Sequence, residues 1–337
     1  MSISFTNLGP ADGDNALFVV VNTGQSQHPL MFDCGEGCAA ELKKSDLQSV
    51  EHLCFSHFHM DHISGFDSFF RNNFNRENGV VNLWGPKQTI DVMHHRFCGF
   101  SWNLHHDQPG EWQVHEISDR EVRAAKFATN EAFKTAHPLP SQELNGSIII
   151  LNPAYSIEAR ILNHGTTPSI GYKIKECDRS NVDMEKLTAQ GLKPGPWLKQ
   201  VTSTNMDDSE TIELDGKTQP VGKLRAEFLI STPGESLAYL TDFCLTDAER
   251  GGVIEWIRGT DTLICEAQYR HSDLDLALRN HHSTTQLVGE IARDAEVGEL
   301  VLQHVSRRYS KAEWLEMLSE TQAVFPNTRF PAHWDLA

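Results

Sequence analysis

Four potential metal ligands lie within six residues directly after an apolar segment, and this cluster constrains the fold more than any other feature of the 337-residue sequence. The apolar run 50–55 is followed by Ser56-His57-Phe58-His59-Met60-Asp61-His62. Alternate side chains of an extended segment lie on one face, so His57 and His59 can point together, while Asp61 and His62 can turn toward a second ion. Imidazole and carboxylate groups together form the ligand set of zinc and similar divalent ions. The sequence therefore predicts a metal site at the end of a strand.

Three further polar residues each follow an apolar run. His164 comes after 159–162, Asp242 after 237–240 and His304 after 299–302. An α/β sheet collects its functional residues at the ends of its strands. A site with two ions needs more ligands than the first cluster offers, and a carboxylate can bridge such a pair. We expect these three residues to complete the site.

The remaining pattern predicts a layered α/β domain. Short apolar runs typical of strands occur at 17–21, 29–33, 50–55, 80–84, 159–162, 169–174, 226–230, 237–240, 262–265 and 299–302. Many are almost continuously apolar, which indicates sheets covered on both faces. Helices are predicted at 285–294, with Ser283 or Thr284 as N-cap, and at 312–324. Trp84, Phe97, Phe100 and Trp102 are expected in the core rather than on a surface that stacks nucleobases.

Composition and charge limit the partners and the cellular compartment that we expect for this protein. The net charge is −17, from 29 Lys and Arg against 46 Asp and Glu, so a nucleic acid would need a local basic patch. No apolar run reaches about 18 residues, which predicts no membrane span, and residues 1–5 do not resemble a secretory signal. The seven cysteines are odd in number and scattered, which indicates reduced thiols and a cytoplasmic protein. Cys34 and Cys38 have no second pair and are expected to be structural.

One segment differs from its surroundings. Residues 178–219 are polar and contain Gly195-Pro196. The composition predicts an inserted arm or long loop, and a plain surface insertion is the alternative.

Taken together, Phe32-Asp33-Cys34-Gly35-Glu36-Gly37, the histidine cluster and His304 resemble the metallo-β-lactamase superfold. The resemblance implies a single domain over 1–337, a four-layer αββα sandwich with an inserted arm at 178–219 and two zinc ions at one edge. It further implies that His57, His59 and His164 hold one ion, that Asp61, His62 and His304 hold the other, and that Asp242 bridges them. Asp33 would support the ligands from behind.

Later motifs resemble ribonuclease Z, the tRNA 3′-processing endonuclease. These are Leu263-Ile264-Cys265-Glu266-Ala267, with Cys265 where that family usually has His, then His282-Ser283-Thr284, and His304-Val305-Ser306-Arg307-Arg308-Tyr309. The segment 187–197 is similar to the family's arm. The resemblance implies endonucleolytic removal of precursor tRNA 3′ trailers and suggests a homodimer.

The residue types suit phosphodiester hydrolysis. A metal lowers the pKa of its bound water to about 7, which makes hydroxide available. Asp61 can orient or deprotonate that water, and His282 can protonate the leaving oxygen while Glu266 fixes its tautomer. Arg307 and Arg308 are expected to contact phosphate. The plainer alternatives are a helix-start histidine and a solvated pair of charges. Zinc is the expected metal, and manganese also suits this ligand set.

Two stretches depart from ribonuclease Z. Residues 8–15 contain no Lys or Arg where the family carries a basic loop. Between Asp183 and Lys217 there are seven acidic and four basic residues, a poor clamp for tRNA. A hydrolase of small phosphodiesters or other small esters at the same site is therefore the alternative function. A metal-binding module without catalysis is a third reading, and the complete ligand set with His282 and Glu266 argues against it.

Overall fold

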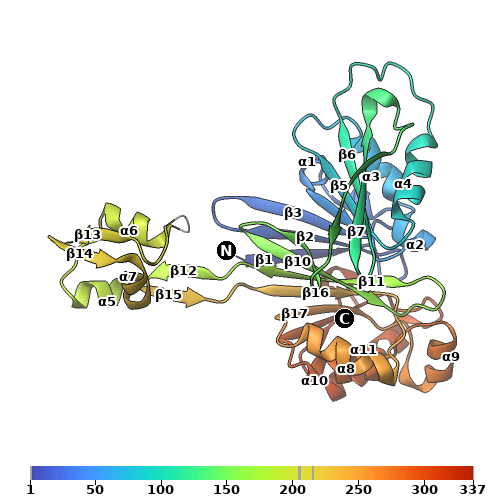
Figure 1. The fold of residues 1–337 in the computed structure, drawn as a ribbon. Helices are drawn as coiled ribbons and strands as arrows, with labels where there is room; N and C mark the ends of the chain where they lie inside the picture. Colours follow the sequence, from blue (N-terminus) through green and yellow to red (C-terminus); the bar gives the residue numbers. More distant parts are fainter. Residues whose placement is uncertain (1, 204–205, 215, 337) are drawn as a thin grey trace. The chain divides into compact units, whose positions relative to one another are not determined.

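The chain forms two compact units, one of Met1–Glu176 with Glu235–Ala337 and the other of Cys177–Gly234 (Figure 1). The computed structural model describes residues 2–203, 206–214 and 216–336. The predicted arm, 178–219, falls inside the second unit, which extends further toward the C-terminus than predicted. One of the acidic arm residues counted above, Asp215, lies outside the described residues.

The first sheet of the large unit has eight strands in sequence order among the described residues. Strands β3 to β6 pair in parallel, and the strands on either side pair antiparallel. The strands are β1 (Ser2–Leu8), β2 (Ala16–Asn22), β3 (Gln27–Phe32), β4 (His52–Cys54), β5 (Val81–Gly85), β6 (Glu111–Ile117), β7 (Glu121–Ala128) and β8 (His137–Glu143).

The second sheet of this unit has seven described strands in the order β19-β18-β17-β16-β11-β10-β9. Strands β16 to β19 pair in parallel, while β9, β10 and β11 pair antiparallel and join the parallel part through β16. The strands are β9 (Ile148–Leu151), β10 (Tyr155–Leu162), β11 (Ser169–Glu176), β16 (Ser236–Leu240), β17 (Thr262–Glu266), β18 (Glu299–Gln303) and β19 (Thr328–Arg329).

Alternation along the strands builds three separate cores. In β16 the side chains of Leu237 and Tyr239 belong to the core between the two sheets, while Ala238 and Leu240 belong to the core beneath the helices. Successive strand residues face opposite sides of a sheet, so a strand covered on both faces is apolar throughout. In the middle core the Phe32 ring of the first sheet meets the rings of Tyr172 and Tyr239, at centroid distances of 5.4 and 5.8 Å.

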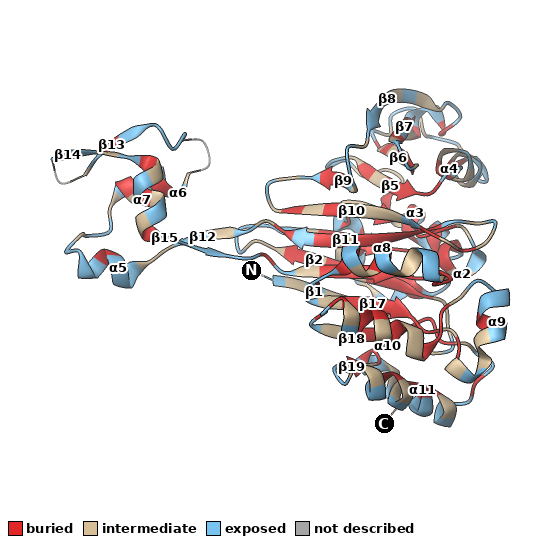
Figure 2. Ribbon diagram, turned by 60° about the horizontal axis from the view of Figure 1, so that its bottom comes forward, coloured by how far each residue is buried: buried red, intermediate tan, exposed pale blue. Residues whose placement is uncertain are grey.

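Helices cover the outer faces of both sheets (Figures 1 and 2). The first sheet packs against α1 (Lys44–Ser49), α3 (Phe66–Asn73) and α4 (Thr89–Cys98), and the second against α8 (Asp247–Ile257), α10 (Thr285–Asp294) and α11 (Lys311–Val324). The predicted four-layer αββα sandwich is confirmed. Shorter pieces are α2 (Met60–Ile63), α9 (Leu274–Arg279) and the 3-10 turns Cys38–Glu41, Thr129–Glu131, His271–Asp273 and Ala332–Trp334.

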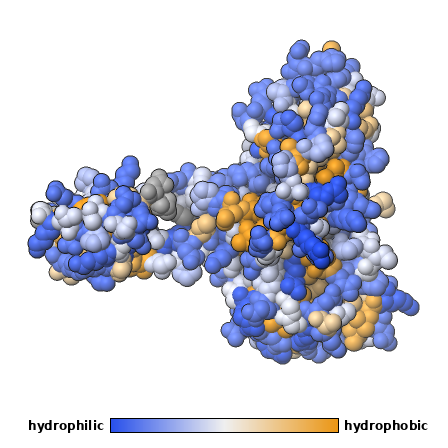
Figure 3. Space-filling view, in the orientation of Figure 1, coloured by the Kyte–Doolittle hydropathy of each residue, from blue (hydrophilic) through white to orange (hydrophobic). Residues whose placement is uncertain are grey.

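The second unit, Cys177–Gly234, has a small core of its own. Its elements are β12 (Arg179–Val182), α5 (Met184–Ala189), α6 (Pro196–Thr202), β13 (Thr211–Leu214), β14 (Lys217–Pro220), α7 (Val221–Phe228) and β15 (Leu229–Thr232). Strands β12 and β15 pair, as do β13 and β14. The buried side chains are Leu187, Trp197, Val201, Ile212, Val221, Leu224 and Phe228. The face of this unit in view in Figure 3 is mostly hydrophilic. The predicted insertion is therefore a folded unit rather than a plain loop.

The strand predicted at 226–230 is wrong. Helix α7 continues to Phe228, and only Leu229 and Ile230 of the predicted range enter β15. Val221, Leu224 and Phe228 are buried at helical spacing, and their packing in the small core decides the local structure. The two predicted helices are confirmed at 285–294 and 311–324, and Thr284 is the N-cap of α10.

The four aromatic residues expected in the core differ in their burial. Trp84 and Phe97 are buried, Trp102 is partly buried, and Phe100 is 43% exposed. Within the described part of the chain, no helix combines the length and apolar character needed to cross a bilayer.

Candidate metal centre

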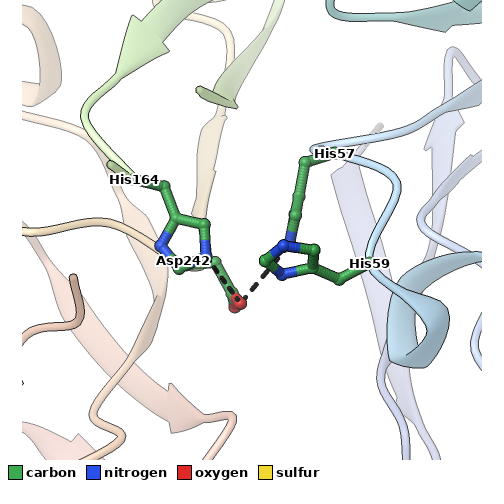
Figure 4. Close-up of side chains that lie close together, drawn as sticks. All are labelled: His57, His59, His164 and Asp242. Atoms are coloured by element: carbon green, nitrogen blue, oxygen red, sulfur yellow. Dashed lines mark ion pairs between the residues drawn. The ribbon is translucent and has the colours of Figure 1, made fainter. Parts of the chain in front are cut away.

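Polar residues that follow strands of both sheets converge at one edge of the large unit. His57 and His59 lie between β4 and α2, and His164 lies just after β10. Asp242 follows β16, and His304 directly follows β18. Figure 4 shows His57, His59 and His164 around the Asp242 carboxylate. The structure thus brings together side chains that are far apart in the sequence.

The first group consists of His57, His59, His164 and Asp242, each offering one ligand atom within 4.8 Å of the others. The Asp242 Oδ2 atom lies 3.5 Å from His57 Nε2 and 3.8 Å from His164 Nε2. His57, His164 and Asp242 are buried, whereas His59 is exposed.

The second group consists of Asp61, His62 and His304, again within 4.8 Å. The other Asp242 oxygen, Oδ1, lies 3.4 Å from His62 Nε2 and 3.3 Å from His304 Nε2. His304 Nε2 is also 3.3 Å from Asp61 Oδ2. The two oxygens of Asp242 therefore face different groups, which is the position expected of a bridging carboxylate.

The donor set fits divalent cations. The Nε2 atoms of His57 and His62 are buried and have no hydrogen-bond partner among the described residues, although buried polar atoms are nearly always paired. Burial lowers the pKa of His57 to about 2, so its ring is neutral, as a metal ligand must be. Burial opposes a charge on His62 too, but the carboxylates of Asp242 and Asp33 raise its pKa well above the usual value. A cation can replace the proton that they favour.

A row of buried groups fixes the ligands from behind. Asp33 Oδ2 accepts from His62 Nδ1, the Ser56 hydroxyl and the Tyr239 hydroxyl, each at 2.8 Å. Its other oxygen accepts from the Ser56 amide at 2.7 Å. With His62 Nδ1 engaged in this way, Nε2 is left to face the cluster. Asp33 thus contacts His62 on the side away from the cluster, and its supporting role stays a prediction.

Backbone and amide groups hold two other histidines. His164 Nδ1 donates to the main-chain carbonyl of His281 at 2.8 Å, which again leaves Nε2 for the cluster. The Gln268 side-chain amide lies 3.2 Å from His304 Nδ1. Sequence reasoning missed Ser56, Tyr239, Gln268 and His281. Ser56 and Gln268 adjoin predicted motifs and were within reach, but the roles of Tyr239 and the His281 carbonyl depend on tertiary contacts.

His282 and Glu266 form a pair beside the cluster. His282 Nδ1 lies 3.0 Å from Glu266 Oε2, and the carboxylate is completely buried. Burial lowers the pKa of His282, but the Glu266 carboxylate raises it by more, to about 9. A ligand atom of His282 lies within 4.8 Å of those of Asp242 and His304. With this pKa the ring carries a proton on both nitrogens near neutral pH, so Nδ1–H can stay with Glu266 while Nε2–H is available for donation.

Several of these residues have left-handed backbone conformations. Asp33, Asp242, His281 and His304 have φ values of 56°, 47°, 60° and 51°. Such values are uncommon outside glycine and carry strain for a histidine. Gly165, beside His164, also has a positive φ, and a Cβ there would lie 2.5 Å from the His281 ring. The chain turns sharply just after β3, β16 and β18, at Asp33, Asp242 and His304.

The two predicted phosphate contacts lie in different surroundings. Arg307 lines a cavity of about 930 Å³ that also borders His59, Asp61 and His304, and its guanidinium is 3.0 Å from Asp14 Oδ1. Arg308 lies against the rings of Tyr269 and Tyr309 and is not among the residues that line this cavity.

Comparison with known proteins decides the family. The chain is 42% identical over 332 residues to ribonuclease Z of Deinococcus radiodurans, covering 98% of each chain. The chain belongs to the ribonuclease Z family. A family model described as Anti-Pycsar protein Apyc1 matches residues 13–162, which hold the first histidine cluster but not Asp242, His282 or His304.

Solved structures agree on the fold. The metallo-β-lactamase fold protein YhfI from Bacillus subtilis superposes with a TM-score of 0.57 at 14% identity, over 98% of this chain and 96% of that one. The short form of human tRNase Z, ELAC1, superposes with a TM-score of 0.52 at 16% identity, over 91% of this chain and 94% of that one.

Where the ribonuclease Z family usually has histidine, this member has Cys265, a buried residue of β17 in the core beneath the helices. The Cys265 thiol is part of that apolar packing and not of the cluster.

Proposed function

We propose that this ribonuclease Z family member is an endonuclease that removes the 3′ trailer of precursor tRNA with two zinc ions. The observation that carries the proposal is the His282–Glu266 pair beside the two ligand groups, in a chain 42% identical to a ribonuclease Z. A bare metal site would not need a carboxylate-held imidazole at its side. Cleavage of RNA does, because the leaving oxygen must gain a proton.

The two ligand groups divide the proposed ions between them. His57, His59 and His164 would hold one ion, Asp61, His62 and His304 the other, and Asp242 would bridge. When bound, the ions would make a nucleophile from water near neutral pH and neutralise charge on the phosphoryl oxygens. Zinc is the metal we propose for this His and Asp set, and manganese is the substitute most compatible with it.

The chain's own residues supply the remaining steps. Asp61 lines the cavity and its side chain is 41% exposed, so its carboxylate can accept the proton of the attacking water. As an imidazolium, His282 donates its Nε2 proton to the leaving oxygen and becomes neutral, while its Nδ1–H stays hydrogen-bonded to Glu266. Buried Asp33 keeps His62 in one tautomer. Arg307 can release Asp14 and pair with a substrate phosphate, and Arg308 is proposed to act further along the RNA.

The proposal also covers the cellular compartment, the oligomeric state and the domain organisation of the enzyme. We infer from the scattered cysteines that it works in the cytoplasm, and from the family resemblance that it is a homodimer. We regard Met1–Glu176 with Glu235–Ala337 as the catalytic domain and Cys177–Gly234 as its inserted arm.

A second candidate is hydrolysis of a smaller phosphodiester at the same site. It is favoured by two carboxylates at the cavity, Asp14 and Glu36, which repel a long phosphate backbone. The small ester retains only one phosphate, so this repulsion matters less for it.

The deciding experiment incubates the purified protein with labelled precursor tRNA, in metal-free buffer and with zinc or manganese, and maps the cut. We expect metal-dependent cleavage at the base of the 3′ trailer, with affinity falling steeply between 50 and 200 mM salt. Bis(p-nitrophenyl) phosphate is the parallel substrate. Intact precursor tRNA alongside rapid turnover of the small diester would decide for the second candidate.

A further inference from the structure

Two polar side chains interrupt the apolar core between the two sheets of the large unit. Asn7 of β1 is 6% exposed and Gln303 of β18 is 1% exposed, and Asn7 Nδ2 donates to Gln303 Oε1 at 3.0 Å. Alternate residues of a strand lie on one face of the sheet. Asn7 therefore shares a face of β1 with Phe5, which packs against this core. Gln303 shares a face of β18 with Val301, which belongs to the core.

An amide pair at this position is unfavourable by itself. Burying a polar group in an apolar core destabilises the fold unless each of its atoms has a partner. The oxygen of Gln303 accepts from Asn7, but Gln303 Nε2 is buried without a hydrogen-bond partner of regular geometry among the described residues. Buried donors in this condition are rare. Apolar side chains would pack the two sheets together without this penalty, so the amides are expected to have another role.

The Tyr239 hydroxyl is the neighbour that accounts for Gln303. Tyr239 belongs to the same core. Burial and the Asp33 carboxylate raise the pKa of Tyr239 well above its usual value, while the Gln303 side chain lowers it. A group that lowers the pKa of a phenol presents a hydrogen-bond donor to its oxygen, and Nε2 is the donor of Gln303. We infer that Nε2 faces the Tyr239 oxygen.

The direction of the Tyr239 hydroxyl depends on this donor. A phenol has one proton to donate and can also accept. With an amide N–H directed at its oxygen, the hydroxyl proton is left for Asp33 Oδ2, which lies 2.8 Å away. The same Asp33 oxygen accepts from His62 Nδ1 at 2.8 Å. A row of hydrogen-bonding groups thus leads from Asn7 to the ring of a proposed metal ligand.

We propose that Gln303 and Asn7 are positioning residues for the metal ligand His62. Gln303 directs the Tyr239 proton to Asp33, which in turn holds the imidazole ring. Asn7 fixes the Gln303 amide so that its nitrogen, and not its oxygen, faces Tyr239. The inference rests on the metal ions of the proposed function, and it extends the support of their site to residues of both sheets. An amide pair that only joins the sheets would affect stability and not metal binding.

The test measures the zinc affinity of the full-length protein by competition with a coloured chelator, and the thermal unfolding midpoint of the metal-free protein. Gln303→Met keeps the length of the side chain and removes its amide. Tyr239→Phe removes only the hydroxyl, and the double variant combines the two changes. Asn7→Leu tests the far end of the row.

Thr321→Val is the matched control. Thr321 is also completely buried, and its hydroxyl donates to the Met317 carbonyl at 3.1 Å. It lies in α11 and belongs to neither ligand group. The control therefore removes a buried hydrogen bond without touching the row.

Gln303→Met and Tyr239→Phe should each weaken zinc binding by about tenfold, and Asn7→Leu should weaken it by less. The double variant should bind zinc as Tyr239→Phe does, because Gln303 acts through that hydroxyl. Thr321→Val should lower the unfolding midpoint and leave the zinc affinity unchanged.

Three results would overturn the positioning role alone. Unchanged zinc affinity in Gln303→Met and Asn7→Leu would make the amide pair purely structural. Losses that multiply in the double variant would mean that Gln303 does not act through Tyr239, and an equal loss in Thr321→Val would mean that zinc affinity only follows stability. A wild type that binds no zinc overturns the proposed function and the positioning role together. A zinc-loaded wild type that leaves RNA intact overturns only the proposed function.

Discussion

The strand-end edge of the large unit and the core of the Cys177–Gly234 unit use burial in opposite ways. At the edge, charged and polar groups such as Asp33, His62 and Glu266 are completely buried. The second unit buries an ordinary apolar set, with Trp197 against Phe228 at a ring distance of 6.0 Å. Buried charges must be paired or bind ions, whereas apolar burial stabilises by itself. The edge is therefore built for chemistry, and the second unit is built to stay folded.

This difference predicts that substitutions in one region leave the properties of the other unchanged. Substitutions at the edge should remove metal or turnover, and substitutions in the second unit should alter its local stability.

The largest effect is expected for His59→Ala. It removes a proposed ligand that is exposed, so the fold should survive while hydrolysis of both RNA and bis(p-nitrophenyl) phosphate falls by a factor on the order of 10³ or more. Metal analysis should show zinc loss. The exposed His106→Ala is the matched control. Wild-type turnover in His59→Ala, or turnover by metal-free protein, would break the two-ion proposal.

The next largest effect tests whether His282 is the general acid. His282→Ala should slow precursor tRNA cleavage by about 10²–10⁴-fold, because the leaving ribose oxygen needs a proton. The aryl diester has a good leaving group and should lose less than about tenfold. Rates for both substrates at saturating zinc provide the measurement. Equal losses would take His282 out of the acid role.

A smaller effect tests the groups behind the ligands. Asp33→Asn should weaken zinc binding by about 10–100-fold, because His62 loses the carboxylate that orients it. Competition with a coloured chelator measures the affinity, and exposed Asp119→Asn is the control. An unchanged affinity would mean that Asp33 supports only the fold.

The smallest effect on turnover is expected from the second unit. Trp197→Ala should cost that unit about 3–5 kcal/mol, seen as faster amide hydrogen exchange over 177–234. Hydrolysis of the aryl diester should stay within about twofold. Ile230→Ala, at a 51% exposed position of the same unit, controls for apolar loss. A parallel fall in diester turnover would contradict the separation of the two regions.

The sequence indicated the residues that meet in the two candidate ligand groups, because each of them lies just after a recognisable strand. Apolar runs such as 299–302 are followed by a polar residue, and parallel strands bring those residues to one edge. It did not indicate the roles of Tyr239 or the His281 carbonyl, because the Tyr239 hydroxyl meets Asp33 and the His281 carbonyl meets His164 only through tertiary contacts between residues far apart in the sequence. The error at 226–230 has a similar origin, since a short apolar run fits a strand or a helix until its packing partners are known.

The left-handed turns at Asp242 and His304 have a consequence for the evolution of this protein. Glycine would relieve the backbone strain at each of these turns but would delete a carboxylate or an imidazole. The sequence with the least backbone strain here is therefore an inactive one. Ions that bind only the folded chain would counter this tendency by mass action. Lineages that lose the ions should therefore accumulate substitutions first at these positions, and the resulting proteins should be more stable but without hydrolytic activity.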